Sequence, residues 1–238
     1  MKPARTDRPL HYPERWTEIP HGEWLAAELQ ERLNAWCPLL FGYHLLKVGA
    51  LSAQLSCDCS AIRHQCALGG HGEGLSLLGR EDALPIQTGS VDACLLAHTL
   101  DYSPDPHQVL REVERVLTDD GWLILSGFNP HGLVGLGRLW PPARRVQPWC
   151  ARMFSPERVE DWLHLLGFEV VRQERFGFSA LSRRSRIQWW KENLGRDYAG
   201  YLASVYVMAA RKRRYPLTPI TRPVRLRKPV AIPGMARI

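Results

Sequence analysis

The clearest pattern of apolar and polar positions lies between residues 83 and 130. Residues 91–97 form an almost unbroken apolar run, which is typical of a strand buried on both faces of a parallel sheet. A second apolar run follows at residues 122–126. The pattern predicts two buried strands whose connection is long enough for a right-handed helical crossover.

The segment between these two runs predicts an amphipathic helix. Asp105 is a suitable N-cap, Pro106 suits the first helical position, and Gln108 is placed to complete a capping box. Residues 119–121, Asp-Asp-Gly, are expected to end the helix. The predicted buried stripe repeats every 3.6 residues and consists of Val109, Leu110, Val113, Val116 and Leu117.

The amino-terminal half predicts an arm, a helix and three further strands. Residues 1–20 are polar and rich in proline, so we expect a loosely held arm. A helix starts at Gly22, and it is expected either to cover part of a site or simply to pack on the sheet. Strands are expected at residues 43–48, 62–68 and 75–78. The apolar face of the helix consists of Leu25, Leu29, Leu33, Trp36 and Leu40.

The last two of these strands are separated by only six residues, GGHGEG. A parallel crossover usually needs a dozen residues or more. We therefore expect the two segments to pair as a hairpin, or one of them not to be a strand.

The carboxyl-terminal half predicts a helix beginning at Ser155 and ending at Gly167, then a strand at residues 168–171. Residues 179–200 are expected to be an inserted surface segment, and residues 201–208 a final strand. This order suits an antiparallel pair of strands that completes a sheet.

Composition and charge divide the 238 residues into three parts. We expect an arm at 1–20, one domain at 21–210 and a disordered, proline-rich tail at 211–238. The formal net charge of +7 comes from the tail, which holds nine of the 31 Lys and Arg and leaves 22 against 24 acidic residues elsewhere. No membrane span or signal peptide is evident, so a cytoplasmic location and six reduced cysteines are expected.

A set of short motifs at fixed spacing adds a family resemblance. They are Leu84-Pro85, Ser90-Val91-Asp92, residues 97–100 (AHTL), residues 104–106 (PDP), Leu110-Arg111-Glu112, Arg115-Val116-Leu117 and Gly121. Together they resemble the second half of a class I S-adenosylmethionine (SAM) dependent methyltransferase of the type 11 group. FGYHLLKVG, SGFNP and the basic residues after 209 resemble an uncharacterised proteobacterial branch of that group. The resemblance implies a Rossmann-like α/β fold, with a mostly parallel sheet, an antiparallel last strand and helices on both faces.

The resemblance also implies where SAM would bind. The turn Gly49-Ala50-Leu51 after the first strand would meet the carboxypropyl and ribose parts, because a side chain at Gly49 would block close approach. A plain turn glycine is the alternative. Asp82 would lie near the adenine amine, beside Ala83 and Leu84. His98 and Leu100 follow the strand at 91–97, at the same edge of the sheet.

His98 is the candidate catalytic residue. Methyl transfer draws its reactivity from the cofactor, so the protein mainly aligns the groups and excludes water. A neutral acceptor can also need a base, and His98 stands at the strand end where one is expected. The alternative is a structural histidine bonded to a neighbouring loop.

Three features favour a second function, a methyltransferase-fold binding or scaffold protein without activity. The family's glycine-rich loop keeps only Gly49, and the usual acidic residue before it is Lys47. The acid that would hold the ribose is missing, with Glu73 a poor substitute, and the link between the second and third strands is short. The methyl acceptor cannot be named from the sequence.

The remaining motifs concern metal binding and nucleic-acid binding. Cys57, Cys59, His64 and Cys66 carry zinc-ligand chemistry, but their spacing matches no common structural pattern, so no metal is expected. The tail predicts weak, nonspecific binding to nucleic acid or another acidic partner, with Tyr215 its only aromatic residue. A merely solubilising tail is the alternative.

Overall fold

The computed structural model of the protein describes residues 5–6, 10–136, 146–178 and 202–213. They form a seven-stranded sheet with the strand order β3-β2-β1-β4-β5-β7-β6. Strands β1 to β5 are parallel, and β7 runs antiparallel between β5 and β6. This confirms the predicted fold class. The strands are β1 (His44–Val48), β2 (His64–Gly69), β3 (Leu77–Leu78), β4 (Val91–Ala97), β5 (Leu117–Phe128), β6 (Phe168–Phe176) and β7 (Val205–Lys212).

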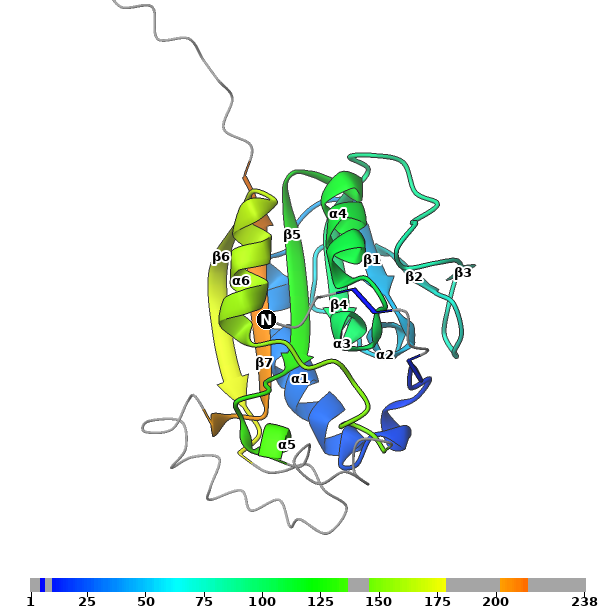
Figure 1. The fold of residues 1–238 in the computed structure, drawn as a ribbon. Helices are drawn as coiled ribbons and strands as arrows, with labels where there is room; N and C mark the ends of the chain where they lie inside the picture. Colours follow the sequence, from blue (N-terminus) through cyan, green and yellow to red (C-terminus); the bar gives the residue numbers. More distant parts are fainter. Residues whose placement is uncertain (1–4, 7–9, 137–145, 179–201, 214–238) are drawn as a thin grey trace, which may run out of the picture.

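Helices cover both faces of the sheet (Figure 1). The long helix α1 (Gly22–Trp36) lies on one face, and α4 (Pro106–Val116) and α6 (Pro156–Leu165) lie on the other. Within the described ranges, no helix combines the length and apolar character needed to cross a membrane. The short helices are α2 (Ala50–Ala53), α3 (Thr99–Tyr102), α5 (Leu133–Leu136) and the 3-10 turns η1 (Trp16–Glu18) and η2 (Cys37–Leu39).

The central βαβ unit forms where the sequence predicts it. Asp105 caps α4 by accepting a hydrogen bond from the Gln108 amide at 3.0 Å. The predicted stripe is buried, and β4 pairs with β5 in parallel. Helix α4 ends at Val116 and β5 begins at the next residue, so residues 119–121 belong to the strand and do not form a separate turn. The pairing of β4 with β5 is irregular at this point.

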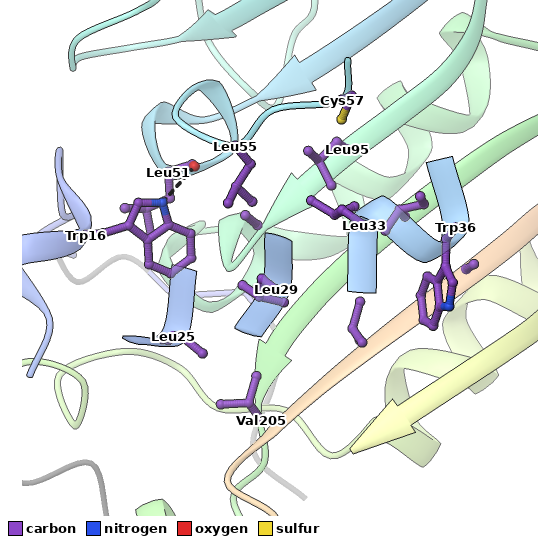
Figure 2. Close-up of a cluster of buried hydrophobic side chains, with 14 of the residues drawn as sticks. Trp16, Leu25, Leu29, Leu33, Trp36, Leu51, Leu55, Cys57, Leu95 and Val205 are labelled. Atoms are coloured by element: carbon purple, nitrogen blue, oxygen red, sulfur yellow. Dashed lines mark hydrogen bonds between the residues drawn. The ribbon is translucent and has the colours of Figure 1, made fainter. Parts of the chain in front are cut away.

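Helix α1 packs the first of two cores. Its predicted apolar face is buried against the sheet, and Figure 2 shows Leu25, Leu29, Leu33 and Trp36 pointing toward it. Burying one such side chain contributes about 1.5–3 kcal/mol. The second core lies between the sheet and the two helices α4 and α6.

The link between β2 and β3 corrects one expectation. The two strands are parallel neighbours, pairing Leu68 with Leu77 and Gly69 with Leu78. They therefore do not form a hairpin, and both segments are strands. A short loop suffices because β3 has only two residues and pairs with the very end of β2, so the chain does not have to return along the sheet.

The folded domain extends beyond both of its expected boundaries, residues 21 and 210. Residues 10–20 lie on the domain, with Trp16 and Ile19 buried in its first core. Strand β7 continues to Lys212, beyond the expected boundary at residue 210. The proposed insertion at 179–200 and the tail from residue 214 lie outside the described residues.

Candidate functional site

The carboxyl ends of the first four strands meet at one edge of the sheet, and a cavity of about 320 Å³ opens there. The loops after β2 and β3 contribute residues 70–71 and 79–82 to its wall, and residues 102–104 close another side. Leu10 and Tyr12 of the amino-terminal arm complete the lining. Open α/β sheets bind ligands at this edge, so the cavity is the candidate site.

Gly49 forms the turn between β1 and α2 with a φ of +94°, a conformation that L side chains rarely adopt. Its amide donates a 2.7 Å hydrogen bond to the Leu68 carbonyl, which ties the turn to β2. A Cβ at this position would collide with the hydroxyl of Tyr12 and lie 3.1 Å from the Thr99 Oγ1 atom. The space above the glycine is therefore filled by the arm.

The next two predicted contacts, Ala50 and Leu51, have fully buried side chains. Only their backbone can face a ligand. The Leu51 carbonyl accepts a 3.1 Å hydrogen bond from Trp16 Nε1, drawn in Figure 2. The arm thus covers this turn as well as Gly49.

His98 lies in the turn between β4 and α3, with a φ of 55° and no exposed surface. Its Nδ1 atom is 2.9 Å from Asp101 Oδ2, and its ring lies 4.1 Å from that of Phe128 between centroids. Because a carboxylate accepts hydrogen bonds, Nδ1 carries a hydrogen, and in the neutral ring Nε2 keeps its lone pair. Nε2 has no hydrogen-bond partner among the described residues. The arrangement is that of an oriented histidine whose free nitrogen is covered.

The remaining predicted contact residues lie in different environments. Asp82 lines the cavity, but its carboxylate binds Arg80 at 2.7 Å, and this hydrogen bond lowers the pKa of Asp82. Ala83 is exposed outside the cavity lining. Leu84 and Leu100 are buried in the core beneath α4. These two side chains therefore pack in the core and do not line the cavity.

Glu81 is a site residue that the motif comparison missed. It lines the cavity, and its pKa is raised to about 7, first by burial and then by the negative charge of Asp82. A carboxyl group held in this way can accept or donate hydrogen bonds near neutral pH. The acidic pair 81–82 is visible in the sequence, but the resemblance to the family's acidic-alanine pair selects only Asp82.

Lys47 and Glu73, which depart from the family pattern, form contacts outside the cavity. Lys47 is buried on the face covered by α1, where its Nζ donates a 2.7 Å hydrogen bond to the Leu55 carbonyl. Glu73 forms an ion pair with Arg15 of the arm. Neither side chain lines the cavity.

The cysteine and histidine motif does not assemble into a cluster. No group of three or more His, Cys, Asp or Glu side chains within the described ranges is placed to hold a metal ion. His64 Nδ1 lies 3.0 Å from His44 Nδ1, and Cys59 Sγ lies 3.5 Å from the Asn34 side-chain oxygen.

Comparisons with known proteins show which family the chain belongs to. The family described as "Methyltransferase domain" matches residues 55–125. The uncharacterized protein YafS of Escherichia coli K12 is 40% identical over 221 residues, which are 92% of this chain and 88% of YafS.

Two solved structures share the fold. One is a SAM-dependent methyltransferase, possibly a histamine N-methyltransferase by its description, from Thermotoga maritima, with a TM-score of 0.54, 22% identity, and 80% of this chain and 95% of that chain covered. The other is a SAM-dependent methyltransferase from Archaeoglobus fulgidus, with a TM-score of 0.56, 16% identity, and coverages of 79% and 94%. The chain therefore belongs to the family that includes YafS, its residues 55–125 match the type 11 methyltransferase domain, and it has the class I SAM-dependent methyltransferase fold.

Proposed function

We propose that the protein is a SAM-dependent methyltransferase whose acceptor is still to be identified. The observation that carries this proposal is the cavity of about 320 Å³ at the carboxyl edge of the sheet, beside the Gly49 turn. Its volume falls in the range of small-molecule sites, and its position is the one that open α/β sheets use for ligands.

The residues present fit the cofactor in two parts. The cavity, with Glu81 and Asp82 in its wall, suits an adenosyl group, because carboxylates accept hydrogen bonds from ribose hydroxyls and from the adenine amine. The Gly49 turn suits the methionyl part, because it has no side chain to obstruct close approach. This second part is available only when Tyr12 has moved away.

When bound, SAM supplies an electrophilic methyl group on a sulfonium sulfur. The protein's contribution is then alignment of the acceptor and exclusion of water. Asp101 orients His98 and leaves its Nε2 lone pair available to accept a proton from a neutral acceptor. That role requires the buried Nε2 atom of His98 to become accessible to the acceptor.

Calorimetric titration with S-adenosylhomocysteine tests the proposal. We expect the protein to bind this product analogue, Glu81→Gln to weaken binding, and the matched control Glu160→Gln on α6 to have no effect. Absence of binding by both the wild-type protein and Tyr12→Ala, in which the cover is removed, would refute the methyltransferase proposal.

The second candidate function is a binding or scaffold protein that does not use SAM. It is favoured by the arm filling the space over Gly49 and by the engagement of Lys47 and Glu73 elsewhere. The same titration separates the two functions, since this candidate predicts no binding with or without the Tyr12 side chain.

A further inference from the structure

Residues 10–15, which we call the strap, run across the rim of the candidate site. At one end, the His11 carbonyl accepts a 3.0 Å hydrogen bond from the Gln147 side chain. At the other, the Glu14 carbonyl accepts a 2.7 Å bond from the Gln54 side chain, and Arg15 pairs with Glu73. The strap therefore contacts three separate segments of the chain, and one of them, the loop after β2, lines the cavity.

The strap is held more firmly at its end than along its length. Trp16, directly after it, is 4% exposed and bonded to the Leu51 carbonyl. The Arg15 and Glu73 side chains are by contrast 56% and 69% exposed, so their ion pair stabilises the closed strap little. The contacts suit a segment that detaches while Trp16 remains as its anchor.

Tyr12 is the part of the strap that enters the site. Its ring lies 5.4 Å from that of Tyr102 between centroids, and its hydroxyl lies where a Cβ of Gly49 would be. That hydroxyl is buried and makes no hydrogen bond of normal geometry among the described residues, although the Thr99 hydroxyl lies nearby. Burying an unpartnered polar group is unfavourable, so the closed position carries a built-in cost.

From these contacts we propose that the strap is an autoinhibitory gate, in which Tyr12 occupies the place of the methionyl part of SAM and must leave before the cofactor enters. The inference rests on the proposed function. The closed protein and the cofactor-bound protein then differ in the position of residues 10–15, and the apparent affinity is lowered by the fraction of molecules that are closed.

The affinity test uses calorimetric titration of the full chain with S-adenosylhomocysteine. If only about a tenth of the molecules are open, Tyr12→Ala should bind roughly tenfold more tightly than the wild type. Tyr12→Phe should bind more weakly than the wild type, because removing the unpartnered hydroxyl favours the closed strap. Tyr43→Ala is the matched control, since that tyrosine is 81% exposed at the opposite end of β1, and its affinity should be unchanged.

Hydrogen exchange provides a second measurement on the wild-type protein. In the closed strap the Glu14 and Arg15 amides donate hydrogen bonds to Glu18 Oε1, both at 3.1 Å. Adding S-adenosylhomocysteine should speed exchange at these two amides and slow it around Gly49. A lid that closes over its ligand would instead slow exchange at both places.

The outcomes separate the inference from the function on which it rests. One outcome is that the wild type binds S-adenosylhomocysteine, Tyr12→Ala binds it equally or more weakly, and exchange in the strap slows. That outcome would overturn the gate and leave the methyltransferase proposal standing. No binding by the wild type, Tyr12→Ala or Tyr12→Phe would overturn both.

Discussion

Lys212 should be one of the main stabilising residues of the sheet, although it lies in the stretch expected to be tail. Its side chain is 4% exposed, and Nζ donates hydrogen bonds to the Glu114 carbonyl at 2.6 Å and the Leu117 carbonyl at 3.0 Å. It also forms an ion pair with the Glu114 carboxylate at 3.0 Å. Lys212 thus satisfies carbonyl groups at the end of α4, where the helix has no partners of its own.

Replacing Lys212 by methionine keeps most of the buried stem and removes these bonds. A hydrogen bond to a charged group contributes about 1.5–3 kcal/mol, and a cation at a helix carboxyl terminus adds about 0.3–1 kcal/mol. Because these contributions are not additive, we expect a loss of about 2–4 kcal/mol in the free energy of unfolding. For a domain of this size, that loss lowers the melting temperature by roughly 5–12 °C.

Urea denaturation followed by circular dichroism, with a thermal scan alongside, measures the effect of Lys212→Met. Arg213→Met is the matched control at the next position, because the pairs of Arg213 with Glu169 and Asp120 are largely exposed and should matter little. A loss below about 0.5 kcal/mol for Lys212→Met, within the usual range of surface substitutions, would refute the idea that this lysine caps α4.

Three further predictions follow from the site and the chain end. Gly49→Ala should destabilise the protein by about 1–3 kcal/mol through backbone strain. The loss should be smaller in the Tyr12→Ala background, because the new methyl group no longer collides with the Tyr12 hydroxyl. Equal losses in the two backgrounds, measured by chemical denaturation, would contradict this contact. Because burial raises the pKa of Glu81 from its ordinary value of 4.5 to about 7, the folded state holds its proton more tightly, so stability should fall as pH rises from about 4.5 to 7. Glu81→Gln should reduce this fall in urea titrations at several pH values, and an unchanged slope would count against a buried carboxyl. Ending the chain after Tyr215 should leave the melting temperature within a few degrees, as no apolar periodicity follows it, whereas a large drop would show that the removed residues support the domain.

The parts of the fold that the sequence predicts well carry strong local signals. Strand β4 is a continuous apolar run, and α4 combines the Asp105 cap with a complete apolar stripe, so both are specified within a few residues of chain. Strand β7 was placed too early. Its extension to Lys212 depends on pairing with β5 and β6 and on a buried lysine, which local hydrophobicity does not reveal.

Sequence patterns could indicate only those parts of the candidate site that lie within one turn of the chain. Gly49 was identified because a glycine after the first strand is a local signal. The approach of Tyr12 to that glycine joins distant segments and has no periodicity to reveal it. Leu84 and Leu100 were expected at the site because they follow strands, but the direction of their side chains is decided by packing beneath α4.

The two edges of the sheet differ in how they resist addition of another strand. Strand β3 offers only two residues, Leu77 and Leu78, so a foreign strand would find little backbone to pair with. Strand β6 is nine residues long, but it has a register irregularity after Val170 and exposes the charged side chains of Glu169 and Arg172. Short length at one edge and charge with a bulge at the other therefore protect this sheet from edge-to-edge aggregation.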